Sequence, residues 1–192
     1  MRRQRTRGTG LVDLLVGTAL ALAVLSVLTA AVGTGARVLV AGGARGEAED
    51  TAQLAVEAFT FDARRAGWDP RAVGIAPLVE ATPSRVTFTA DLDANGAVDA
   101  SSEEKTAHVC TAGVGRLSRI IGRQSLPLAD GLSRCAFRYL DATGTAIAVP
   151  AAGLSPTALA GVRAVALDLT LLPSGLRGRA DRTVLVALRR AS

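Results

Sequence analysis

A long uninterrupted run of apolar residues lies close to the N-terminus. From Leu14 to Ala36 no residue is charged, and most are Leu, Val or Ala. As a helix this run would extend about 34 Å, enough to cross a bilayer core of about 30 Å. The pattern therefore predicts a transmembrane helix within residues 9–40. A cleaved secretory signal has a shorter apolar region, although residues 30–33 are compatible with a weak cleavage site.

A second helical pattern follows this run after several glycines. Its apolar residues recur at intervals of three and four, as they do on one face of a helix: Ala52, Ala55, Val56, Phe59, Ala63 and Ala66. Gly67 suits a helix C-terminus, and Pro70 prevents the helix from continuing. We expect an amphipathic continuation of the N-terminal helix over residues 41–69.

The remaining residues, 70–192, alternate between apolar and polar positions in short runs. This alternation is clearest at residues 86–90, 134–139, 165–171 and 184–188, and it indicates half-buried strands. Residues 70–192 are therefore expected to form a globular β-rich head. The predicted fold class is α+β, in which a long N-terminal transmembrane helix and its amphipathic continuation pack on a mostly antiparallel β-sheet.

The net charge of +5 is concentrated in a basic leader, residues 1–8. Four arginines in this leader supply nearly all the excess, at positions 2, 3, 5 and 7. A nucleic-acid-binding protein would carry its basic patch on the folded domain, so we expect no nucleic-acid partner for the head. By the positive-inside rule, the leader predicts a cytoplasmic N-terminus.

Asp13 is an unusual residue at the start of an apolar run. An acidic side chain costs about 2.5–3.5 kcal/mol at the centre of a bilayer and less toward its edges. One interpretation places Asp13 at the interface, where water solvates it. The other is that a positive group meets this carboxylate inside an assembly.

The residues from Gly8 to Val16, GTGLVDLLV, resemble the prepilin processing motif. In that motif a basic leader and a Gly precede a mature helix with an acidic residue at its fifth position. The resemblance implies that a prepilin peptidase cleaves between Gly8 and Thr9 and methylates the new N-terminus. It also implies that Asp13, which stands where the family usually has Glu, neutralises the N-terminal amine of a neighbouring subunit.

Later segments are similar to W-type minor pilins and J-type minor pseudopilins, notably residues 61–67 and the strand and turn that follow Cys135. The implied function is a structural subunit of a type IV pilus or type II secretion pseudopilus, with other pilin or pseudopilin subunits as partners. The implied location is the inner membrane, crossed once, with the head periplasmic or extracellular. The alternative is a signal-anchored envelope domain that binds a ligand and does not polymerise.

The loop that begins at Asp91 has the residue spacing of a calcium-binding loop. Oxygen ligands would come from the side chains at positions 1, 3, 5 and 9 and from the carbonyl at position 7: Asp91, Asp93, Asn95, Asp99 and Ala97. Position 12 is Ser102 rather than the bidentate Glu, although Glu103 and Glu104 lie just beyond it. The alternative is an Asn-Gly turn with solvated acids. Calcium is thus a candidate cofactor, bound weakly.

The two cysteines, Cys110 and Cys135, predict either one structural disulfide or two buried thiols. A disulfide between them would contribute about 3 kcal/mol in the chain-entropy model. The single histidine, His108, has no partner at the spacing of a triad or a metal site, and we interpret it as an ordinary strand residue. The sequence contains neither a P-loop nor a nucleophile elbow, so we expect no enzymatic activity.

Overall fold

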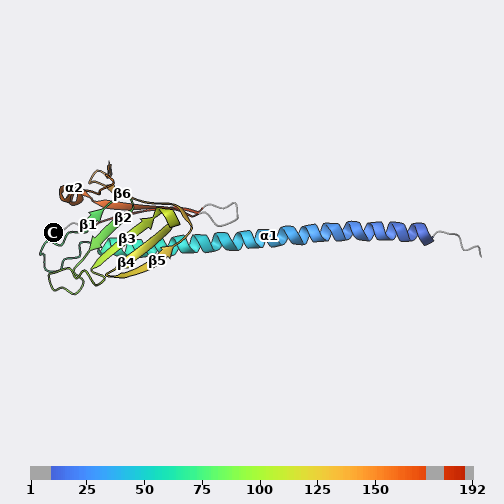
Figure 1. Cartoon of the computed structure of the whole chain (residues 1–192), viewed down its shortest axis with the longest axis horizontal. Helices are drawn as coiled ribbons and strands as arrows, with labels where there is room; N and C mark the ends of the chain where they lie inside the picture. Colours follow the sequence, from blue (N-terminus) through green and yellow to red (C-terminus); the bar gives the residue numbers. More distant parts are fainter. Residues whose placement is uncertain (1–9, 172–179, 189–192) are drawn as a thin grey trace, which may run out of the picture. The chain divides into compact units, whose positions relative to one another are not determined.

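The computed structural model describes residues 10–171 and 180–188 (Figure 1). For residues 10–13, 30–45, 48 and 180 it describes the backbone alone. The chain divides into two compact units, residues 1–43 and 44–192. Helix α1, Gly10–Arg65, contributes residues to both units.

In the first unit, the described side chains of α1 are those of residues 14–29, which we call the apolar segment. Each of its large apolar side chains is more than half exposed. Among the described residues, no helix combines the length and the apolar character needed to cross a membrane.

This finding corrects three linked predictions. The expected transmembrane helix at the N-terminus is wrong, and with it that part of the predicted fold class. The expected single pass through the inner membrane, with a cytoplasmic N-terminus and a head on the other side, is wrong for the same reason. The finding also counts against the membrane-anchored pilin that the sequence predicts.

The second unit contains two antiparallel sheets rather than the one sheet expected. The first sheet has the strand order β1-β2-β3-β4-β5, and its strands are β1 (Leu78–Ala81), β2 (Arg85–Thr89), β3 (Lys105–Thr111), β4 (Arg116–Ile121) and β5 (Gln124–Ala129). The second has the order β7-β6-β8-β9, with strands β6 (Leu132–Leu140), β7 (Ala146–Ile147), β8 (Ala164–Leu171) and β9 (Ala180–Ala187). A short 3₁₀-helix, Ala112–Val114, follows β3, and helix α2, Pro156–Gly161, precedes β8.

Both sheets contribute side chains to one shared core. The core side chains of both sheets belong to a single apolar cluster, which also contains one face of α1. Phe59 of α1 lies at this junction, because its ring is 5.7 Å from that of Phe88 on β2 and 5.9 Å from that of Phe137 on β6. Alternation in the sequence predicts which face of a strand is buried, but not which strands share a sheet.

Specific contacts join the two sheets. Cys110 on β3 and Cys135 on β6 form a disulfide, with their Cα atoms 5.5 Å apart. The buried hydroxyl of Tyr139 on β6 donates to the carbonyl oxygen of Thr82, 2.8 Å away in the connection between β1 and β2. Burial raises the pKa of Tyr139. The head is therefore held together by one covalent bond and by buried polar contacts as well as by its apolar core.

Candidate functional site

The predicted assembly residues lie at the start of the chain. Gly8 and Thr9 are outside the described residues, so the proposed cleavage position remains a prediction. Asp13 lies in the first turns of α1, and its side chain is likewise outside the described part. What the structure describes nearby is the apolar segment, in which Leu15, Leu22 and Leu28 are each more than half exposed.

The few polar side chains of the apolar segment form hydrogen bonds within α1. Thr18 Oγ1 donates to the carbonyl oxygen of Leu15 at 3.0 Å, and Ser26 Oγ donates to that of Ala23 at 2.7 Å. Thr29 Oγ1 donates to the carbonyl oxygens of Leu25 and Ser26, both at 3.0 Å. These hydroxyls have internal partners, so burying any side of the segment would not leave them without a hydrogen bond.

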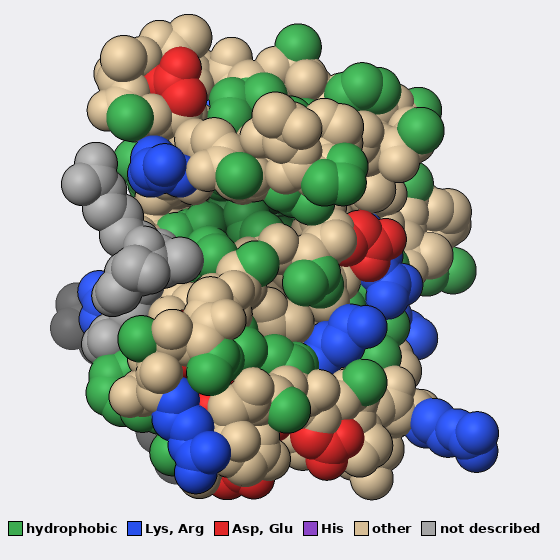
Figure 2. Space-filling view, turned by 90° about the vertical axis from the view of Figure 1, so that its left-hand side faces the viewer, with side chains coloured by type: hydrophobic (Ala, Val, Ile, Leu, Met, Phe, Trp, Pro, Cys, Tyr) green, Lys and Arg blue, Asp and Glu red, His purple; other side chains and the backbone are tan. Residues whose placement is uncertain are grey.

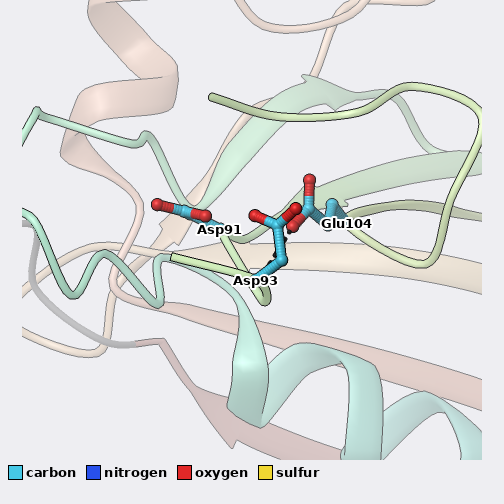
Figure 3. A group of neighbouring side chains, drawn as sticks. All are labelled: Asp91, Asp93 and Glu104. Atoms are coloured by element: carbon cyan, nitrogen blue, oxygen red, sulfur yellow. Dashed lines mark hydrogen bonds between the residues drawn. The ribbon is translucent and has the colours of Figure 1, made fainter. Parts of the chain in front are cut away.

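The acidic loop, residues 91–104, connects β2 to β3 and brings together part of the predicted calcium site. Carboxylate oxygens of Asp91, Asp93 and Glu104 lie within 4.8 Å of one another. Figure 3 shows the three carboxylates side by side, two from the start of the loop and one from the residue just before β3. Asp91 and Asp93 belong to the predicted ligand set, whereas Glu104 does not.

Glu104 organises this loop through three backbone amides. Its Oε1 accepts hydrogen bonds from the N–H groups of Leu92 at 2.8 Å and Asp93 at 3.1 Å. Its Oε2 accepts one from the N–H of Asp99 at 2.8 Å. These three N–H groups lower the pKa of Glu104, and the N–H of Asp99 contributes most. The sequence signal for this role was the acidic pair just beyond position 12 of the loop.

The other predicted calcium ligands have partners within the loop. Asp99 accepts hydrogen bonds from the N–H and the hydroxyl of Ser101, which lower its pKa. Asn95 Oδ1 accepts a hydrogen bond from the N–H of Ala97 at 2.7 Å, and the amide of Asn95 donates to Asp93 Oδ2. Neither side chain belongs to the three-carboxylate cluster.

A divalent cation would therefore meet three clustered carboxylates rather than the five ligands that the spacing predicted. Calcium binds oxygen ligands at about 2.3–2.6 Å, so one ion could contact the three clustered carboxylates together. Asp91 is buried, and its carboxylate also accepts the N–H groups of Asn95 and Gly96 at 3.0 and 2.8 Å. The loop is thus ordered by its own amides, and calcium binding remains a prediction.

A largely buried network that the sequence does not predict joins four charged or titratable side chains: Asp62, Arg65, His108 and Arg119. Asp62 lies on α1, and its Oδ2 is 2.9 Å from His108 Nε2 on β3. Arg119 on β4 donates to both oxygens of the same carboxylate, at 2.6 and 2.8 Å, and Arg65 donates to Oδ1 at 3.0 Å. Asp62 and His108 are almost fully buried.

The partner of His108 is 46 residues away in the sequence, on a different element, so no local spacing could reveal it. This contact has the form of a histidine–carboxylate pair, but the described residues offer no hydrogen-bond partner to Nδ1 of His108. A catalytic triad would need a nucleophile at that nitrogen. The contacts that the structure describes for this network attach α1 to β3 and β4.

Comparison with known proteins adds no family to these observations. No protein-family model matches the chain, and no curated protein matches it.

Proposed function

We propose that this chain is a structural subunit of a filament of the pilin or pseudopilin kind, and that it assembles through the apolar segment of α1. The observation that supports this proposal is the exposure of that segment. Its nine large apolar side chains, in the range Leu14–Leu28, are all more than half exposed. Burying a Leu or Val side chain contributes about 1.5–3 kcal/mol, so contact with other subunits would strongly stabilise such a helix.

The distribution of these side chains favours a helix surrounded by neighbours rather than one docked on a single partner. Apolar residues occupy every side of the segment, as the consecutive run Leu14, Leu15 and Val16 illustrates. A helix that is apolar all round is normally buried on all sides. The internally bonded hydroxyls of Thr18, Ser26 and Thr29 suit the same environment.

The proposal includes processing and specific contacts at the N-terminus. A prepilin peptidase would cleave between Gly8 and Thr9, which removes the basic leader. The carboxylate of Asp13 would then pair with the N-terminal amine of the adjacent subunit. Other pilin or pseudopilin subunits are the expected partners.

Crosslinking of the full chain, coexpressed with a prepilin peptidase, tests this proposal. Leu22→Cys places a thiol in the apolar segment, and Leu126→Cys places a matched exposed thiol on β5. Oxidation should join Leu22→Cys subunits into disulfide-linked dimers, whereas the Leu126→Cys variant should give few. N-terminal sequencing should give Thr9, and omission of the peptidase should abolish the dimers.

Asp13→Ala separates ordered assembly from general apolar aggregation. If the carboxylate pairs with a neighbouring amine, this variant should be processed normally but crosslink much less through Leu22→Cys. A chain that keeps Met1, or that crosslinks equally at both positions with and without the peptidase, would contradict the filament proposal. A processed but monomeric chain would favour the alternative, a ligand-binding domain that does not polymerise.

A further inference from the structure

A groove on the head lies between β1 and α2, away from the acidic loop and the buried network. Its volume is about 640 Å³, within the range of about 300–1,000 Å³ that is typical of ligand pockets. Pro77, Leu78 and Val79 line one wall, and Pro156, Leu159 and Arg163 line the other. Figure 2 views the side of the head where Figure 1 shows α2, and hydrophobic side chains gather in a hollow there.

The wall formed by β1 presents side chains rather than an open strand edge. β1 is an edge strand of the first sheet, but its register with β2 shifts between Leu78 and Glu80. Val79 lies at this irregularity and is 46% exposed. The carbonyl oxygen of Ala81 already accepts the N–H of Leu154 at 2.9 Å. An occupant would therefore be held by apolar contacts rather than by adding a strand to the sheet.

The opposite wall carries a positive charge that has no carboxylate partner among the described residues. Arg163 Nη1 donates to the carbonyl oxygens of Ala160 and Val162, at 2.7 and 2.9 Å, and these bonds hold the guanidinium at the end of α2. Its Nε is buried and has no hydrogen-bond acceptor in the described part of the chain. A fixed guanidinium beside an apolar surface favours a ligand that brings both apolar groups and a carboxylate.

We propose that this groove binds a short extended peptide segment of a partner protein, with apolar side chains against Val79 and Leu159 and one carboxylate on Arg163. The dimensions of the walls support a peptide. Four residues of strand β1 extend about 13 Å and six residues of helix α2 about 9 Å, so three or four extended residues fit between them. This interaction is independent of the apolar segment and so goes beyond the filament proposal.

Fluorescence anisotropy with dye-labelled peptides and the full chain tests this inference. The probes are acetylated tetrapeptides of Leu and Val with a single Asp or Glu at either end, and matched peptides in which Asn or Gln replaces the acid. At least one acidic peptide should bind saturably and about tenfold more tightly than its amide counterpart, as loss of a charge-assisted hydrogen bond predicts. Arg163→Gln should remove that preference, whereas Arg123→Gln, on an exposed turn, should keep it.

A second pair of variants keeps the test valid if Arg163→Gln disturbs α2. Val79→Glu introduces a negative charge at an exposed groove position and should abolish binding of the acidic peptides. Val73→Glu, at an exposed position that does not line the groove, should leave binding unchanged. The proposal is overturned if no peptide binds, if acidic and amide peptides bind equally, or if both Val→Glu variants behave alike. It is also overturned if the chain forms dimers that Val79→Glu abolishes and Val73→Glu does not. A second copy of the chain would then occupy the groove.

Discussion

Replacing Asp62 with asparagine removes the negative charge that joins α1 to β3 and β4 but keeps the size of the side chain. The carboxylate accepts hydrogen bonds from Arg65, His108 and Arg119 within 3.0 Å and is almost completely buried. In Asp62→Asn two arginines would face a neutral amide. Removing one partner of a buried ion pair typically costs about 3–5 kcal/mol, and we expect the free energy of unfolding at pH 7 to fall by that amount.

The same carboxylate makes a defined contribution to the pH dependence of stability. Burial alone would raise the pKa of Asp62, but hydrogen bonds from Arg119 and His108 outweigh it and lower the pKa from 3.8 to about 2. Because the folded-state pKa lies below the unfolded one, ionised Asp62 stabilises the native state above about pH 4. This contribution, about 2 kcal/mol, is lost as the pH falls from about 4 toward 2.

Urea unfolding of the full chain, followed by far-UV circular dichroism between pH 7 and pH 2, measures both effects. Other carboxylates with lowered pKa values, such as Glu104 and Asp168, also contribute to acid sensitivity. The difference in free energy of unfolding between the native chain and Asp62→Asn reports on the Asp62 carboxylate alone. This difference should shrink by about 2 kcal/mol between pH 4 and pH 2.

Asp130→Asn is the matched control, because Asp130 forms an ion pair with Arg116 in which both side chains are about half exposed. An exposed pair contributes about 0–1 kcal/mol, so this variant should unfold almost like the native chain. The stabilising role of Asp62 is contradicted if Asp62→Asn costs no more free energy of unfolding than Asp130→Asn. It is also contradicted if the loss of stability in Asp62→Asn is the same at pH 4 and pH 2.

Three further predictions concern a turn, the disulfide and the acidic loop. Gly115 has a φ of 56°, and an added methyl group would overlap the carbonyl oxygen of Leu132. Gly115→Ala should therefore lower the free energy of unfolding by at least about 1–2 kcal/mol, as measured by thermal unfolding. Gly113 has open space around it, so Gly113→Ala should change stability little. Replacing Cys110 and Cys135 with serine should cost about 3 kcal/mol; a reductant should destabilise the native chain similarly and leave the double variant unchanged. If the acidic loop binds calcium with millimolar affinity, 10 mM Ca²⁺ should stabilise the native chain by about 1 kcal/mol and the Asp93→Asn variant by much less. Equal stabilisation of the native chain and the variant, or stabilisation by Mg²⁺ alone, would exclude calcium binding at the three-carboxylate site.

Local features of the head could be predicted from the sequence because they depend on local periodicity. The three- and four-residue spacing of Ala52, Ala55 and Phe59 identified the face of α1 that is buried in the core. Alternation identified Phe137 and Val165 as inward-facing strand residues. Such patterns report which side of an element avoids water, and that depends only on neighbouring residues.

Long-range features could not be predicted in this way. The division into two sheets depends on which strands pair, and the contact of His108 with Asp62 depends on how α1 crosses the first sheet. In the acidic loop, spacing found Asp91 and Asp93 but not Glu104, because the chain returns to the cluster at position 14 of the loop rather than position 12. The predicted transmembrane helix is wrong for another reason: among the described residues, no helix is both long and apolar enough to cross a membrane.

The attachment of α1 to the head has a mechanical consequence. Between Ala52 and Arg65 the helix is held to both sheets through Phe59 and to the first sheet through Asp62. A pulling force that reaches this part of α1 would have to shear the aromatic contacts and the ion pairs together. The disulfide between β3 and β6 would share that load between the sheets. Under such a force the core of the second unit should resist until these contacts break together.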